Sequence, residues 1–167
     1  DKEDHWRSLF KHGIGLTTPS QEELLSRRGI LIGNMRPTRV RAAAVKSIKR
    51  NLFRKIHTIG AVPLSFEENL VLLQRHKFVV SPTGNGRDCH RHWEALLVGT
   101  VPIIERDSAL MEAMDGLPVW WVDSYKEVTE DAYNLESTRL KETWSKANIR
   151  KLYTDWWVER IISSTCR

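Results

Sequence analysis

Short apolar runs alternate with longer amphipathic segments along most of this chain. A compact apolar run bounded by turn residues is typical of a buried strand. Five such runs are expected to form strands, at residues 29–33, 55–59, 77–81, 101–104 and 117–122. Because most of these runs are continuously apolar, the pattern favours a sheet covered on both faces.

The segments between these runs carry start signals for helices. Ser20, Ser65 and Ser124 are each followed three residues later by a glutamate, which is the pattern of a capping box. Residues 38–52 predict a helix whose buried stripe recurs every fourth position, at Val40, Ala44, Ile48 and Leu52.

Three further helical segments follow later in the chain. Residues 88–98 are expected to form a helix that ends at Gly99, and residues 108–114 a shorter one. Residues 134–167 are expected to be mostly helical, as two helices that meet near Ala147.

The alternation of strands and helices predicts an α/β fold. We expect a Rossmann-like, doubly wound parallel sheet of about five strands, with C-terminal helices, formed by residues 1–167 as a single domain. Ligands of such folds bind beyond the carboxyl ends of the strands. That rule directs attention to the loops after the first, third and fourth strands.

The composition is that of an ordinary globular domain and does not identify a function. Hydrophobic residues make up 41% and charged residues 28% of the chain, as in ordinary globular domains, and no apolar run has the length of a membrane span. Residues 1–104 hold 17 Lys and Arg against 9 Asp and Glu, which suggests an anionic partner. The cysteines, Cys89 and Cys166, match no zinc motif and do not fix the compartment.

The loop after the third strand carries the strongest candidate chemistry. Gly84 and Gly86 allow a tight turn and a close approach of the backbone to a ligand. The start of the following helix offers unpaired amides to a phosphate, and Arg87, His90 and Arg91 add positive charge. The loop is neither a Walker A motif nor a dinucleotide fingerprint. A plain turn before a helix capped by Asp88 is the alternative.

The spacing of charges on that helix adds to this picture. Arg87, Arg91 and Glu94 are spaced i, i+4 and i+7, so they are expected to share one face. Such a face could be a solvated ion-pair cluster. It also has the cations that a diphosphate requires and a carboxylate that could accept hydrogen bonds from ribose hydroxyls.

Residues 81–104, Ser-Pro-Thr-Gly-Asn-Gly-Arg-Asp-Cys-His-Arg-His-Trp-Glu-Ala-Leu-Leu-Val-Gly-Thr-Val-Pro-Ile-Ile, resemble the donor-site signature of exostosin-like glycosyltransferases. The resemblance extends loosely over residues 28–165. It implies a GT-B fold, which has two Rossmann-like lobes around a cleft, and transfer of a sugar from a UDP- or GDP-sugar to a hydroxyl of a glycan or glycoprotein. The chain would be the donor-binding lobe, with an N-terminal lobe missing.

The resemblance also implies roles for individual residues. Glu94 would hold the ribose, and Arg91 and the amides around Gly84–Gly86 the diphosphate. The whole expected donor site comprises Asn34, Arg41, Ser81, Gly84, Asn85, Gly86, Arg87, His90, Arg91 and Glu94. The general base would come from the other lobe, with His90 and Asp88 as reserve candidates for acid–base work. We expect no metal ion.

Two readings from other classes of protein remain open. Residues 36–55 hold eight Lys and Arg and no acid, which would suit nucleic acid, although a solvated helix face accounts for them better. We therefore expect neither nucleic acid nor a membrane as a partner. The chain could also be an inactive lobe kept for protein contacts, which exposed Trp156 or Trp157 would indicate. The seven tryptophans are otherwise assigned to packing.

Overall fold

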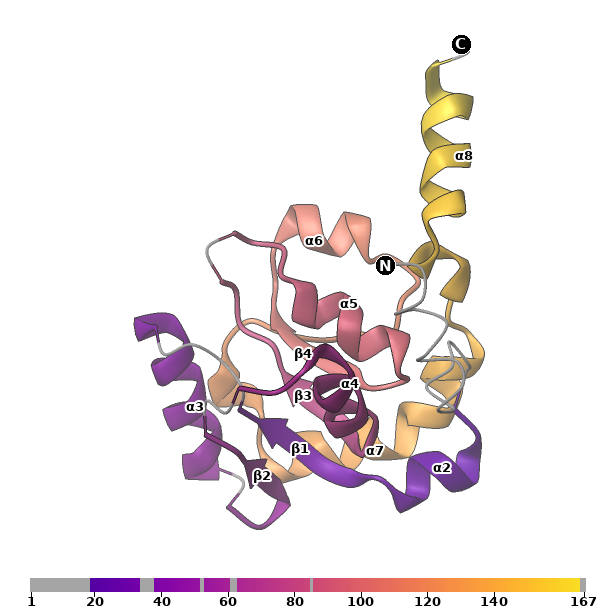
Figure 1. Cartoon of the computed structure of the whole chain (residues 1–167). Coiled ribbons are helices and arrows are strands. Elements are labelled where there is room, and N and C mark those ends of the chain that lie inside the picture. The colour runs from indigo at the N-terminus through magenta and orange to yellow at the C-terminus, as the bar shows by residue number, and fades with distance from the viewer. Residues whose placement is uncertain (1–18, 34–37, 52, 61–62, 85, 166–167) are drawn as a thin grey trace.

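The computed structural model describes residues 19–33, 38–51, 53–60, 63–84 and 86–165. Its centre is a sheet of five parallel strands in the order β2-β1-β3-β4-β5 (Figure 1). The strands are β1 (Arg28–Ile32), β2 (Ile56–Thr58), β3 (His76–Val80), β4 (Val101–Glu105) and β5 (Trp120–Val122). This is the expected doubly wound α/β fold, and all five predicted strands are confirmed.

Helices cover both faces of the sheet, as the apolar strands require. The helices are α2 (Gln21–Ser26), α3 (Arg39–Asn51), α4 (Phe66–Gln74), α5 (His90–Leu97), α6 (Ser108–Ala113), α7 (Glu130–Ser145) and α8 (Thr154–Thr165), with short 3-10 turns η1 (Phe53–Lys55), η2 (Tyr125–Glu127) and η3 (Ile149–Leu152). One apolar cluster joins β1 and β3 to α4 and α5, through Leu31, Val79, Leu70, Leu73 and Ala95. A larger one joins the opposite face to α3 and α7, through Ile30, Phe78, Ala44, Ile48 and Tyr133.

The start signals read from the sequence are confirmed. Capping boxes are present at Ser20, Ser65 and Ser124, where each serine side chain accepts a backbone amide and the glutamate three residues later closes the box. The predicted stripe of α3 is confirmed at Ala44 and Ile48, which are buried. The side chains of Val40 and Leu52 lie outside the described part of the chain. Gly99 ends α5 with a φ of 73°, as expected.

Some predicted boundaries were wrong. The helix expected from Asp88 begins at His90, and its N-cap residue is Cys89. The fifth strand begins only at Trp120, and α7 begins at Glu130 because Thr129, rather than a residue near Asn134, supplies its cap. The C-terminal helices are separated by η3, close to the expected break at Ala147.

The strand order creates one special position in the sheet. The chain passes from β1 outward to β2 and then returns to β3 on the other side of β1, so the connections reverse direction between β1 and β3. The loops after these two neighbouring strands therefore lead to opposite faces and leave a crevice at the carboxyl edge. In open α/β sheets this switch point is where ligands bind.

The C-terminal helix is anchored through aromatic side chains. Trp157 meets Trp93 of α5 and Trp156, with ring centroids 6.4 and 4.7 Å away. Its Nε1 donates a hydrogen bond to the Lys151 carbonyl oxygen at 2.9 Å. Both Trp156 and Trp157 are half-buried, and beyond them α8 extends away from the body of the domain (Figure 1).

Candidate functional site

A cavity of about 460 Å³ opens at the carboxyl edge of the sheet, between α3 and the loop that joins β3 to α5. We call it the switch-point pocket. Its lining residues are Arg41, Pro82, Gly84, Gly86, Asp88, Cys89, His90, Arg91 and Glu94. Six of these belong to the donor site expected from the sequence, and Asp88 and His90 are the two reserve acid–base candidates.

The two glycines shape the floor of this pocket. The Gly84 amide donates to the Gly86 carbonyl oxygen at 3.1 Å, which closes a tight turn. A Cβ atom added to Gly84 would stand 3.0 Å from Nη2 of Arg41. Glycine therefore lets the guanidinium group of α3 approach the loop closely.

Two cations from different elements meet in the pocket. Arg91 of α5 donates from Nη1 to the carbonyl oxygen of Gly33 at 3.1 Å, which ties α5 to the end of β1. Burial lowers the pKa of Arg91, Cys89 and Glu94 raise it, and the charge of Arg41 lowers it further. The two guanidinium groups are thus close enough to disfavour one another, and an anion between them would relieve that repulsion.

Glu94 stands one turn beyond Arg91 along α5. It is half-buried and lines the pocket. Its Oε2 accepts a hydrogen bond from Nδ2 of Asn69 on α4 at 3.0 Å, which fixes the orientation of the carboxylate. A carboxylate held in this way can still accept hydrogen bonds from ligand hydroxyls.

The start of α5 differs from the sequence expectation. Asp88 does not cap the helix, because its Oδ1 accepts a hydrogen bond from the indole Nε1 of Trp93 at 2.9 Å. Cys89 occupies the N-cap position and makes no side-chain capping hydrogen bond. His90, the first residue of the helix, is exposed at the pocket rim.

Below Cys89 lies a polar cluster that the sequence did not reveal. Oγ of Ser81 lies 2.7 Å from Nδ1 of His92, and Sγ of Cys89 lies 3.8 Å from the same nitrogen. Ser81 and His92 are fully buried. Burial alone would raise the pKa of Cys89, but His92, the Arg91 amide and Ser81 outweigh it, and the pKa falls to about 7. The only signal in the sequence is the i, i+3 spacing of Cys89 and His92.

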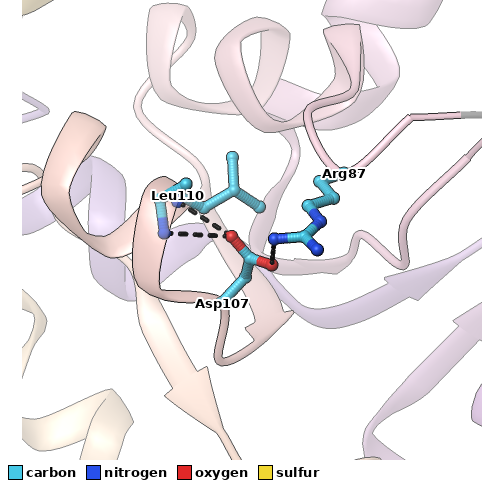
Figure 2. Close-up of polar contacts among 4 residues, drawn as sticks. Arg87, Asp107 and Leu110 are labelled. Carbon is cyan, nitrogen blue, oxygen red and sulfur yellow. Dashed lines mark hydrogen bonds and ion pairs between the residues drawn. The ribbon is translucent and has the colours of Figure 1, made fainter.

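Arg87 does not share a helix face with Arg91 and Glu94, because it precedes α5. Figure 2 shows it turned toward Asp107, where Nη1 meets Oδ2 at 3.0 Å. The other oxygen of Asp107 accepts the amides of Ala109 and Leu110 and so caps α6 (Figure 2). Arg87 thus ties the glycine loop to α6 and does not line the switch-point pocket.

The structure does not place the three remaining expected site residues in the pocket lining. The Ser81 side chain is engaged by His92 beneath the loop, so it is not presented to the pocket. Asn34 and Asn85 lie outside the described residues.

The basic segment 36–55 includes an exposed face of α3. Lys46, Lys49 and Arg50 point into solvent on this helix, and Arg41 is the member of the segment that lines the switch-point pocket.

The described residues contain no group of three or more His, Cys, Asp or Glu side chains arranged to hold a metal ion. Among the helices described, none combines the length and hydropathy needed to cross a bilayer.

No protein-family model and no curated protein matches the chain.

Proposed function

We propose that this chain is the donor-binding lobe of a glycosyltransferase and that the switch-point pocket holds the nucleoside diphosphate of a UDP- or GDP-sugar. The observation that carries the proposal is the convergence of Arg41, Arg91 and Glu94 on one pocket beside the glycine loop. The resemblance of residues 81–104 to exostosin-like enzymes supports the same assignment.

The diphosphate would lie against the guanidinium groups and the start of α5. Arginine suits this role because its planar group forms paired hydrogen bonds with phosphate oxygens and stays charged when buried. The start of α5 adds the positive end of its helix dipole. Charge that develops on the leaving diphosphate would then meet donors that are already in place.

The nucleoside would lie deeper along α5, where Glu94 can accept hydrogen bonds from two ribose hydroxyls. The hydrogen bond from Asn69 holds the Glu94 carboxylate in one orientation, so little ordering is needed when the ligand arrives. The acceptor would be a hydroxyl of a glycan or glycoprotein, and we assign its general base to a second, N-terminal lobe. Of the reserve candidates, His90 is exposed at the rim, whereas Asp88 is engaged by Trp93.

Calorimetric titration of the chain with UDP, GDP and CMP tests the assignment. We expect UDP or GDP to bind, and Arg91→Met to weaken binding by about tenfold or more, because hydrogen bonds to charged groups contribute about 1.5–3 kcal/mol. Glu94→Gln should weaken it by roughly three- to tenfold for the same reason.

Arg106→Met is the matched control, since Arg106 pairs with Asp123 on the surface and does not line the pocket. Thermal unfolding of each variant separates lost binding from lost folding. The proposal fails if no nucleoside diphosphate binds the parent chain, or if Arg91→Met and Glu94→Gln bind as the parent does. Binding of RNA with a steep salt dependence, together with indifference to nucleoside diphosphates, would favour the nucleic-acid alternative instead.

A further inference from the structure

A second cavity, of about 480 Å³, lies at the opposite edge of the sheet, between α2, α7 and the beginnings of β2 and β3. We call it the lysine pocket. It is lined by Lys55, which directly precedes β2, by Lys77 near the start of β3, and by Lys141 of α7. Because it opens at the amino ends of the strands, it is separate from the switch-point pocket.

The charge of this cavity has one sign. Its remaining lining residues are Gln21, Leu24, Leu25, Tyr133, Asn134, Ser137, Thr138 and Leu140, so no acidic side chain is among the described residues that line it. A cavity lined by three ammonium groups and no described carboxylate favours an anionic ligand. Charge complementarity therefore indicates a negatively charged ligand.

One residue that lines the cavity, Ser137, carries a hydroxyl group that lacks a partner. Oγ of Ser137 is buried and makes no hydrogen bond with any residue the structure describes. A buried hydroxyl without a partner is unfavourable, and an acceptor oxygen on a ligand would remove that penalty. Ser137 lies on α7 one turn before Lys141, which places the hydroxyl and the ammonium group on the same side of the helix.

Part of the wall is apolar and well supported. Leu24 and Leu140 are buried, and the Tyr133 ring is held edge-on to Phe78 with centroids 5.7 Å apart. Nζ of Lys55 stands 5.7 Å from the centroid of the same Tyr133 ring. An apolar floor below a cationic rim suits a ligand with a charged head and an apolar body.

We propose that the lysine pocket binds a small amphipathic organic anion, in which a carboxylate or phosphate is carried on an aromatic or aliphatic body. The head group lies among the three ammonium groups and accepts from Ser137. The body lies against Tyr133, Leu24 and Leu140. This site is independent of the donor site, so its ligand does not compete with a nucleoside diphosphate.

Titration calorimetry with phenyl phosphate and 3-phenylpropionate tests the proposal. The comparison compounds are 3-phenylpropanol, which lacks the charged head group, and inorganic phosphate, which lacks the apolar body. At low salt, one of the two anions should bind at least tenfold more tightly than both comparison compounds. The two anions also distinguish the preferred head group. Saturating UDP should leave this binding unchanged.

Matched lysine variants locate the site. Lys77→Met and Lys141→Met should each weaken binding of the preferred anion at least fivefold, and Ser137→Ala about threefold. Lys49→Met is the control, because Lys49 is exposed on α3 and outside the pocket. Lys141 is exposed, so its variant remains informative if Lys77→Met fails to fold.

The proposal is overturned if 3-phenylpropanol or inorganic phosphate binds as tightly as the preferred anion, if neither anion binds, or if Lys49→Met weakens binding as much as Lys141→Met does. The last result would reveal attraction by overall charge alone. None of these outcomes bears on whether UDP binds at the other edge of the sheet.

Discussion

The two pockets at opposite edges of the sheet have almost the same volume, about 460 and 480 Å³, but they are built in different ways. The switch-point pocket combines a glycine loop and a helix start with side chains of both charges. The lysine pocket is made of long side chains that project from regular elements over an apolar floor. The first should therefore respond to changes in backbone shape, and the second to changes in side-chain charge.

The largest effect should follow from a glycine beneath the lysine pocket. A Cβ on Gly29 would stand 2.2 Å from the carbonyl oxygen of Lys55 and 3.4 Å from the hydroxyl of Tyr133. The carbonyl belongs to the main chain and cannot move aside. We expect Gly29→Ala to lower the free energy of unfolding by about 2–3 kcal/mol, as overpacking does.

Urea unfolding of Gly29→Ala measures this loss. Gly60→Ala is the control, because an added Cβ there meets nothing within 4 Å. Equal stability of the two variants would show that the strand can shift, and that the floor of the lysine pocket is less rigid than its packing indicates.

The second prediction concerns the reactivity of Cys89, a thiol that lines the switch-point pocket and not the lysine pocket. Because the pKa of Cys89 falls to about 7, its thiolate fraction rises as pH increases through 7, whereas an ordinary thiol titrates near 8.5. Alkylation by iodoacetamide should therefore reach half its maximal rate near pH 7. At that pH about half of the thiol is ionised, against about 3% for an ordinary cysteine.

Mass spectrometry of the Cys89 peptide across pH 5.5–9.5 gives this profile free of any contribution from Cys166. His92→Gln should move the midpoint upward, because it removes the group that most lowers the pKa. A midpoint above pH 8 in the parent chain would contradict the proposed influence of His92.

A third effect compares the two glycines of the same loop. Gly84→Ala places a Cβ 3.0 Å from the end of the Arg41 side chain, which can turn away. Stability should change by less than about 1 kcal/mol. Under the proposed function the affinity for UDP should fall by about three- to tenfold, because the cation is displaced.

Gly86→Ala is the matched comparison, since its Cβ would make an ordinary contact of 3.5 Å with the Asp88 carbonyl oxygen. Titration calorimetry with UDP compares the affinities of the two variants. If Gly86→Ala weakens UDP binding more than Gly84→Ala does, the approach of Arg41 is not what shapes the pocket.

The smallest effect should come from the ion pair that borders the loop. Arg87 is 73% exposed in its side chain, and exposed pairs contribute about 0–1 kcal/mol, so Arg87→Ala should lower stability by less than about 0.5 kcal/mol. Asp107→Ala should lower it by about 1 kcal/mol, because it also removes the cap of α6. Thermal unfolding of both variants at low and high salt measures the two losses of stability. A larger loss for Arg87→Ala than for Asp107→Ala would show that the ion pair contributes more to stability than the helix cap does.

Local features of the fold were predictable from the sequence because both partners of each interaction are close in the chain. The capping boxes at Ser20, Ser65 and Ser124 span three residues each and were confirmed. The predicted start of α5 was wrong by two residues. The Asp88 carboxylate accepts a hydrogen bond from Trp93 and does not cap the helix, and the capping rules do not consider such a contact. The order of the strands depends on how the elements pack and was not part of the prediction.

In the candidate site, too, contacts between residues close in the chain were predictable and contacts between distant segments were not. The spacing of Arg91 and Glu94 placed both on one side of α5, where they line one pocket with Arg41. The pairing of Arg87 with Asp107 spans twenty residues and two loops, and the contact of Ser81 with His92 joins a strand end to a buried helix face. Such contacts arise only after the chain has folded, so periodicity could not reveal them.

The contact between Trp93 and Asp88 has an optical consequence. One end of this indole is hydrogen-bonded to the pocket rim, and its ring faces Trp157 at 6.4 Å, within easy range for exchange of excitation energy. Any rearrangement of the rim alters the surroundings of a natural chromophore that is coupled to a second one. We therefore expect a ligand that rearranges the rim to change the tryptophan fluorescence of the domain, which requires no added label.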